Sequence, residues 1–448
     1  MWKGLKIVAG VVAALLVIVL AIYAVSRWLP PERAQRDALA RVDTPPQRQG
    51  RNGFALLWAV QRDVPEGQVA ELLARDVARF EATPQPAAEG GGTPYQSLLE
   101  QHPELRVDRP GAPDGCRWHE DGCLQRVRAD VAGYGAWVAD NRILLQRVAA
   151  LSDYDHFANA FPARLDMPIP SYQALGLPLA EHALAFVQGQ TDAALSGVCR
   201  DGMLGRKLVR SGDNLIGAMV GSAMLSGNAA LLADMLAELP ADHPLPATCA
   251  AAFAPLDTLA DDACAVMLAE GRFAINGMRQ HAREELRQKR SVGLLFDPEK
   301  TAARMAPRFA WYCGEAAKRL VAQDLPLAEP LVETTRWSLA CVSNPIGCIL
   351  GDIAAPAYRD YGLRLQDMAA RLRVVNALLW LRQQAQPAGT SALASLPAAL
   401  QSSARPVRLS ADGAWIEVDL YERRQGEEIL RLPLPASRLP REAAGNLP

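Results

Sequence analysis

The feature that most constrains this chain is an uncharged apolar run near its start. Residues 7–25 are nineteen consecutive residues without a charge, preceded by Lys3 and Lys6 and followed by Arg27 and Trp28. A helix of that length rises by about 28 Å, which is enough to cross the hydrocarbon core of a bilayer. The rest of the 448-residue chain has an ordinary globular composition. We therefore expect a transmembrane anchor at residues 1–29 and a large domain tethered to it.

A cleaved signal peptide shares the basic start and the apolar run with an anchor. The apolar core of a signal peptide is about 7–15 residues long and leads to a small-x-small cleavage site. Here the run is longer, and the nearest site, Ile22-Tyr23-Ala24, is poor. No cysteine lies near the end of the run, which argues against lipoprotein processing. We therefore favour retention of the segment as an anchor.

The cysteines decide which side of the membrane we expect for the large domain. Positive residues flank the apolar run on both sides, so the positive-inside rule gives no clear answer. An even number of cysteines without a metal pattern is more expected in an oxidising compartment than in the cytosol. The excess of arginine over lysine suits a GC-rich bacterial genome. We therefore place residues 7–25 in a bacterial inner membrane and the bulk of the chain in the periplasm. The eight disulfide candidates are Cys116, Cys123, Cys199, Cys249, Cys264, Cys313, Cys341 and Cys348.

Two pairs of cysteines are close in sequence. Six residues, including a Gly or Pro, separate Cys116 from Cys123 and Cys341 from Cys348, and such loops close readily. The first loop also holds His119, so a metal site at Cys116, His119 and Cys123 is a weaker alternative. Structural zinc needs four ligands, usually as two closely spaced pairs, and no second Cys/His pair of that spacing exists. We favour a disulfide there and expect no metal or other cofactor.

The pairing of the remaining four cysteines stays open at this point. Cys249 and Cys264 lie in a helix-rich stretch that is expected to bend at Pro255, so they could staple a helical hairpin. Alternatively, each could pair with Cys199 or Cys313. Eight cysteines allow 105 complete pairings, and the sequence does not choose among them.

The hydrophobic pattern predicts a mainly helical fold. Residues 30–52 are rich in Pro and Arg and are typical of a solvated juxtamembrane linker. Residues 53–400 have mainly helical periodicity, clearest at 358–384, where apolar residues recur at alternating spacings of four and three. A loop is expected at 83–94. Other helices are expected at 63–80, 215–239 with a break near Gly227, 247–269, 302–322 and 325–339.

The last segment, residues 401–448, changes character. Asp412-Gly413 is a hairpin turn signal, and apolar residues alternate with other residues over 415–420. Gln425-Gly426 offers a second turn, and Pro433 suggests that the final strand lies at an edge. We therefore expect a small antiparallel β-meander followed by a C-terminal tail.

The chain shows no catalytic signature. It lacks a Gly-x-Ser-x-Gly elbow, a His-Glu-x-x-His motif and the glycine-rich phosphate loops. The net charge of −2 and the pI near 6.3 argue against nucleic acid as a partner. Asp153-Tyr154-Asp155-His156, Asp261-Asp262 and Glu284-Glu285 could supply carboxylates for hydrolysis, although solvated polar clusters are the favoured interpretation.

These observations predict a membrane-anchored periplasmic binding or structural protein of the bacterial cell envelope, with a protein partner there. The alternative is a membrane-anchored envelope hydrolase that uses paired carboxylates. A large cleft with paired acids would favour the hydrolase, whereas an exposed apolar groove among the helices would favour the binding protein.

Overall fold

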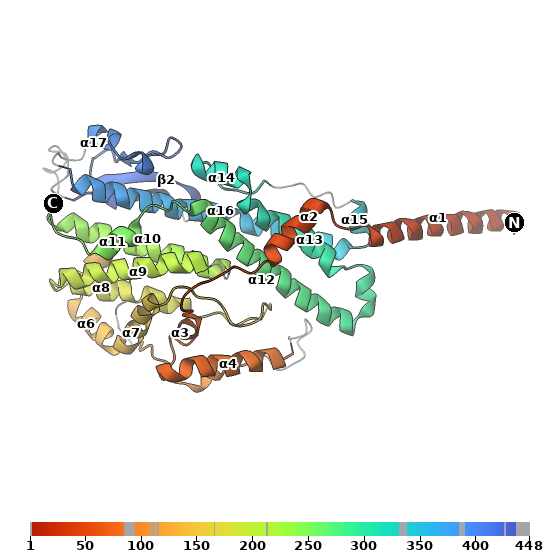
Figure 1. Ribbon diagram of the computed structural model, residues 1–448, viewed down its shortest axis with the longest axis horizontal. Coiled ribbons are helices and arrows are strands. Elements are labelled where there is room, and N and C mark those ends of the chain that lie inside the picture. The colour runs from red at the N-terminus through yellow and green to blue at the C-terminus, as the bar shows by residue number, and fades with distance from the viewer. Residues whose placement is uncertain are drawn as a thin grey trace.

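The computed structural model describes residues 2–84, 95–108, 113, 116–164, 166–211, 214–330, 338–384, 390–424 and 427–435. The fold is mainly helical with a small three-stranded antiparallel sheet near the C-terminus, as the sequence predicts. Helix α1 (Trp2–Trp28) projects as a long rod from one end of the helical body, and β2 lies toward the other end (Figure 1).

The segment after α1 is not the solvated linker that we expected. It contains α2 (Arg33–Asp43), which packs against α13 (Pro298–Ala310) and buries Ala38 and Val42. Arg272 fixes the end of α2, because its Nε donates a hydrogen bond to the Val42 carbonyl at 3.0 Å. Two apolar residues four apart are enough for one buried helical stripe, although the composition around them is polar.

The first part of the body consists of short helices. The expected helix at 63–80 is present as α4, which begins one residue after Pro65. Of the expected loop at 83–94, residues 85–94 lie outside the described part of the chain. The helices here are α3 (Phe54–Trp58), α4 (Glu66–Ala82), η1 (Leu98–Gln101), α5 (Cys123–Ala129), α6 (Val131–Asp140), α7 (Arg142–Ala150), η2 (Leu151–Asp153), η3 (Tyr172–Gly176) and α8 (Pro178–Val187).

Longer helices form the centre of the body. They are α9 (Thr191–Ser211), α10 (Leu215–Glu238), α11 (Ala247–Phe253), α12 (Leu259–Gln288), η4 (Arg290–Leu294), α13, η5 (Trp311–Cys313), α14 (Glu315–Ala322), α15 (Leu339–Val342), α16 (Pro345–Arg382), α17 (Thr390–Ala394) and η6 (Ala398–Leu400). The helices expected at 247–269 and 302–322 each divide in two, and residues 325–330 are not helical. Helix α16 begins at Pro345 instead of Tyr358, because Pro suits the first turn of a helix.

The predicted break near Gly227 is wrong, because α10 is continuous through that residue. Its glycine serves packing: a Cβ at Gly227 would lie 2.7 Å from Cδ1 of Trp118. Helix α10 also meets α9 closely, since a Cβ at Gly221 would lie 2.5 Å from the Gly205 carbonyl oxygen. The glycines of α10 therefore allow close packing of this helix against α9 and against Trp118.

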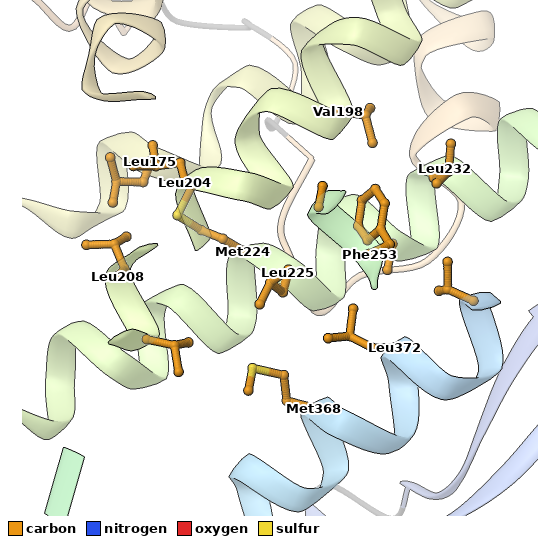
Figure 2. Close-up of a cluster of buried hydrophobic side chains, with 14 of the residues drawn as sticks. Leu175, Val198, Leu204, Leu208, Met224, Leu225, Leu232, Phe253, Met368 and Leu372 are labelled. Atoms are coloured by element: carbon orange, nitrogen blue, oxygen red, sulfur yellow. The ribbon is translucent and has the colours of Figure 1, made fainter. Parts of the chain in front are cut away.

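The core lies where α9, α10, α11 and α16 meet (Figure 2). Besides α1, α10 is the other described helix that is long and apolar enough to span a membrane, but 56% of its most apolar window is buried inside the body. Its apolar character therefore serves the core. The side chains that fill this region include Val198, Leu204, Leu208, Met224, Leu225, Leu232, Phe253, Met368 and Leu372.

The C-terminal meander matches the prediction. Strands β1 (Arg408–Leu409), β2 (Trp415–Arg424) and β3 (Glu427–Pro433) lie in the order β1-β2-β3, so β3 is an edge strand. Gly413 has a φ of 69°, the left-handed conformation that the first turn requires. The second predicted turn, Gln425-Gly426, lies outside the described residues.

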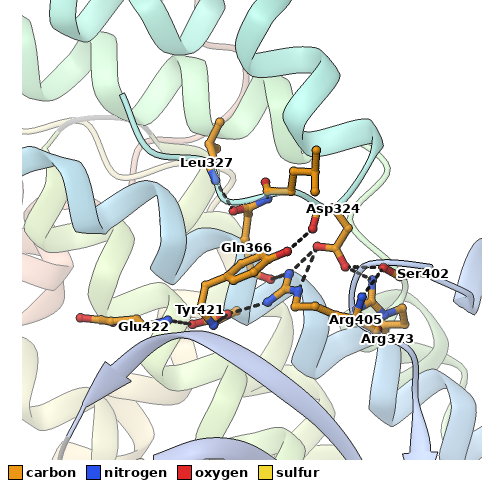
Figure 3. A network of polar contacts seen from close by, with 10 residues as sticks. Asp324, Leu327, Gln366, Arg373, Ser402, Arg405, Tyr421 and Glu422 are labelled. Atoms are coloured by element: carbon orange, nitrogen blue, oxygen red, sulfur yellow. Dashed lines mark hydrogen bonds and ion pairs between the residues drawn. The ribbon is translucent and has the colours of Figure 1, made fainter. Parts of the chain in front are cut away.

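A buried polar network joins the meander to the helices (Figure 3). Arg405 is 2% exposed; its Nη1 contacts Asp367 Oδ1 at 2.7 Å, and its Nε donates to Asp324 Oδ1 at 3.1 Å. Arg373 Nη1 donates to Asp324 Oδ2 at 2.8 Å. The backbone N–H of Tyr421 on β2 donates to Asp367 at 2.9 Å. One arginine thus ties α16, the turn after α14 and the sheet together.

Candidate functional site

All eight predicted disulfide cysteines are paired. Each of the two short loops is closed by a disulfide, as its spacing indicates. The other four cysteines, whose partners the sequence leaves undecided, form two disulfides that each join different helices. The hairpin staple between Cys249 and Cys264 is not formed. The disulfides are Cys116–Cys123, Cys199–Cys249, Cys264–Cys313 and Cys341–Cys348.

Cys116, His119 and Cys123 do not form the metal site considered as an alternative. The two sulfurs are bonded to each other, so neither is a thiolate ligand, and His119 is exposed. Across the described ranges, no three His, Cys, Asp or Glu side chains converge in a way that could hold a metal ion.

The carboxylate clusters singled out in the sequence have structural partners. Asp155 Oδ2 accepts the Arg51 backbone N–H at 2.7 Å. Asp262 Oδ2 accepts the Thr258 hydroxyl at 2.9 Å at the start of α12. Glu284 is bonded to a glutamine one turn further along the same helix. In each cluster, therefore, one carboxyl group already has a structural role.

A buried histidine–aspartate pair was not anticipated from the sequence. His182 Nε2 lies 2.7 Å from Asp201 Oδ2, and Arg200 Nε donates to Asp201 Oδ1 at 2.8 Å. Although burial opposes ionisation, the bonds to His182 and Arg200 lower the pKa of Asp201 below its ordinary value. The ring of His182 also fills the space beside Gly197, where a Cβ would lie 2.4 Å away. We interpret this pair as a link between α8 and α9.

A groove between α10, α12 and α16 is the better candidate site. It encloses about 550 Å³, and its walls are largely apolar. Met219 and Val220 come from α10 and Phe273 from α12. At its edge, Ile169 and Ile216 are 53% and 47% exposed, so large apolar side chains here face solvent. Such a concave apolar surface is the usual form of a binding site.

The groove continues along α10 and α16. A second hollow of about 420 Å³ shares Met219, Ala223 and Arg364 with the first one. It extends toward His119 and toward Glu422 on β2. We call the two connected hollows the α10–α16 groove.

The half-buried carboxyl group of Glu270 lies in the apolar part of this groove. Glu270 Oε2 accepts the backbone N–H of Leu215 at 3.0 Å and so caps the first turn of α10. The Tyr358 side chain also hydrogen-bonds Glu270. Burial raises the pKa of Glu270 above its ordinary value, because the charged form is poorly solvated there. A cationic ligand group beside this carboxyl would favour its ionised form.

Two further polar groups line the groove. Arg364 Nε donates to Glu422 Oε1 at 2.7 Å, and its guanidinium lies 4.4 Å from the centre of the Tyr361 ring. The Trp118 indole Nε1 is buried without a hydrogen-bond acceptor among the described residues. An indole N–H is a donor only, so a ligand carbonyl could satisfy it.

A larger hollow, of about 840 Å³, lies between α17, η6 and β1. Its charged lining residues are Arg408 and Asp412. Arg408 already contacts Asp419 at 2.7 Å, and Asp412 bonds within its own turn. Among its lining residues, no polar side chain is left for a ligand within an apolar wall. Although this hollow is larger, the α10–α16 groove is therefore the better candidate site.

Comparison of the chain with known protein families, with curated proteins and with solved structures finds no match. The assignment of the α10–α16 groove as the candidate site therefore rests on its geometry and chemistry.

Proposed function

We propose that this protein is a membrane-anchored binding or structural protein of the bacterial cell envelope. Its bulk lies in the periplasm, and it holds an apolar segment of a protein partner in the α10–α16 groove. The observation that carries the proposal is the groove itself: solvent-facing isoleucines at its edge, apolar walls, and the half-buried carboxyl of Glu270 in its apolar part.

Contacts at the end of α1 support its retention as an anchor. Ser26 is fully buried, and its Oγ accepts the Ser343 backbone N–H at 2.9 Å. Lys300 Nζ donates to the carbonyls of Ser26 and Arg27, each at 2.7 Å. The last turn of α1 is therefore built into the body. Cleavage near Ala24 would instead place a new charged N-terminus directly beside the buried Ser26.

The groove supports a binding function over the alternative of a hydrolase with paired carboxylates. Each carboxyl along it already has a structural partner: Glu270 caps α10, Asp367 contacts Arg405, and Glu422 contacts Arg364. A glycosidase-type mechanism needs two carboxyl groups that face the substrate.

The location can be tested by thiol labelling of spheroplasts with a membrane-impermeant reagent and mass mapping of the cysteines. We expect label only after reduction, because all eight cysteines are paired and the domain lies outside the cytoplasm. Free thiols that react only after the membrane is broken would place the domain in the cytoplasm and contradict this part of the proposal.

The groove can be tested with a defined probe. We would measure binding of a fluorescent leucine-rich peptide with one lysine, and of the same peptide with norleucine in its place, to the full chain in nanodiscs. We expect the lysine peptide to bind about tenfold more tightly, because a hydrogen bond to a charged group contributes about 1.5–3 kcal/mol. Glu270→Gln should remove this difference, since the amide can still cap α10 but carries no charge.

Two exposed isoleucines provide matched variants for this measurement. Ile216→Asp at the edge of the groove should weaken binding of both peptides, whereas Ile143→Asp on α7 should leave both unchanged. These residues are 47% and 52% exposed, so neither variant is expected to unfold the body. Equal binding of the two peptides to wild type, or no effect of Ile216→Asp, would contradict a peptide site in the groove.

A further inference from the structure

Exposed apolar side chains gather around the point where α1 leaves the body. They come from η4 and the residue after it, from α15, and from the start of α16. Each is between 41% and 70% exposed. Exposed apolar patches on a folded protein mark contact surfaces. We call this patch the exit face; it consists of Leu294, Leu295, Leu339, Val342, Ile349 and Ile353.

Hydrogen bonds hold the exit face against the end of α1. The Tyr23 hydroxyl donates to the Leu294 carbonyl at 2.7 Å. The hydroxyls of Ser26 and Ser343 lie 2.9 Å apart, which joins α1 to the turn after α15. In Figure 1, α15 lies at the base of α1, at the end of the body from which the rod projects. The direction of α1 relative to this face is therefore fixed by contacts.

The segments of the exit face are also tied to one another. The Ile346 backbone N–H donates to the Leu295 carbonyl at 3.3 Å, which joins α16 to the segment after η4. The Cys341–Cys348 disulfide joins α15 to the first turn of α16. The three segments that carry the exposed apolar residues are thus held together.

The depth of the exit face matches the end of the apolar span. Tyr23, which contacts Leu294, lies two residues before Val25, where the uncharged run ends. The large apolar side chains of α1, such as Leu16, are exposed along the rod. If α1 crosses a bilayer, Leu294 lies where the hydrocarbon meets the headgroups, a level that aromatic residues such as Tyr favour.

Cations flank the exit face. Arg283, Arg287, Lys289 and Arg290 are exposed on the last turns of α12 and the start of η4, directly before Leu294. Glu284 and Glu285 lie among them, and Glu284 pairs with Arg287 at 3.7 Å, but the four cations outnumber the two acids. Basic residues next to a membrane segment are attracted by anionic phospholipid headgroups.

We propose that the exit face lies in the headgroup–acyl boundary of an anionic phospholipid bilayer. The body then rests on the membrane as one rigid unit with α1. This inference rests on the proposed role of α1 as an anchor. An apolar face next to cations is the composition that binds interfacial membrane surfaces.

The test is photocrosslinking of the full chain in vesicles of phosphatidylcholine and phosphatidylglycerol. Benzoylphenylalanine is placed at one of three exposed positions: Ile353 on the exit face, Ile143 on α7 as the matched control, and Leu16 within α1. Lipid adducts are then measured by mass spectrometry. We expect adducts at positions 16 and 353, with at least about tenfold more adduct at 353 than at 143.

The three positions separate failure of this inference from failure of the anchor. Lipid adducts at 16 combined with a background yield at 353, or with a crosslink from 353 to a second copy of the chain, would overturn the inference and leave the anchor standing. Background yields at both positions would show that α1 is not in the bilayer, and the inference would fall with it.

A charge variant gives an independent measurement. Ile353→Asp should lower the lipid adduct from a crosslinker at position 294 by about fivefold, because a charge at this depth is costly. Ile143→Asp should leave that yield unchanged. The melting temperature in detergent should not change for either variant, since both isoleucines are exposed. An unchanged yield for Ile353→Asp would contradict the proposed contact.

Discussion

Reduction of the four disulfides is expected to unfold the globular part of this chain at physiological temperature. Two bridges, Cys199–Cys249 and Cys264–Cys313, close loops with sequence separations of 50 and 49 residues. Loop-closure entropy assigns each of these about 4 kcal/mol and each short bridge about 2 kcal/mol. The sum is comparable with the total stability of an ordinary domain, about 5–15 kcal/mol. The measurement is the melting temperature of the full chain in detergent, followed by circular dichroism with and without reductant.

Paired serine variants separate long bridges from short ones. Cys199→Ser with Cys249→Ser should lower the melting temperature more than Cys116→Ser with Cys123→Ser, whose sequence separation is only 7. The long bridge also joins α9 to α11 within the core, so its loss frees two buried helices. An unchanged melting temperature with eight titratable thiols after reduction would show that the bridges do not stabilise the fold.

The elements that the sequence predicts well are those with a regular local pattern. The stripe over 358–384 recurs for several turns and appears in α16, and the alternation over 415–420 with its Asp412-Gly413 turn appears in β2 and its hairpin. In both cases one buried face repeats with the period of the backbone, so neighbours along the chain determine the structure.

The elements that the sequence predicts poorly depend on tertiary contacts. Gly227 considered alone predicts a break in a helix, and only its contact with the ring of Trp118 explains its place inside α10. Likewise, Ala38 and Val42 lie in a segment of polar composition, and α13 supplies the surface that buries them. Local propensity is overridden where a distant side chain decides which residue fits.

The α10–α16 groove could not be predicted because its residues are far apart in the sequence. Glu270 resembles any other acidic residue on α12, and only the position of Leu215 and Tyr358 gives it a buried environment. The same holds for the pairing of the four separated cysteines, where spacing leaves the partners undetermined. The apolar helix α1, by contrast, needs no distant contact to be predicted, because its length and apolarity alone make it a candidate membrane span.

Burial and the arginines act in opposite directions on the two carboxyls of the Arg405 network. Burial raises the pKa of Asp367 above its ordinary value. Burial also acts on Asp324, but Arg405 and Arg373 outweigh it and hold the pKa of Asp324 below its ordinary value. The contribution of Asp324 to stability is therefore present at neutral pH and is lost as the pH falls through its lowered pKa.

Replacement of Arg405 by alanine is expected to destabilise the fold by about 3–5 kcal/mol, because removal of one partner leaves buried charges uncompensated. Asp324 and Asp367 would lose their shared cation, whereas the Tyr421 N–H on β2 would still donate to Asp367. The measurement is denaturant unfolding of the full chain at pH 7, with Arg408→Ala as control. The Arg408 side chain is 36% exposed, and its pair with Asp419 lies at the surface. Its other partner, the buried Glu417, keeps Arg431 at 2.8 Å, so the loss of Arg408 should cost at most about 1 kcal/mol.

A compensated variant distinguishes an uncompensated charge from lost packing. Adding Asp367→Asn to Arg405→Met removes the carboxylate that is left without a cation, since Asp324 keeps Arg373 as its partner, and should restore a large part of the stability lost in Arg405→Ala. The deficit of Arg405→Ala should also shrink at low pH, because protonation of Asp324 removes the charge that Arg405 neutralises. Equal costs for Arg405→Ala and Arg408→Ala would show that the network does not hold the sheet. A deficit independent of pH and of the aspartate substitution would assign the effect to packing of the arginine stem against Tyr421, whose ring centre lies 3.9 Å from the guanidinium carbon.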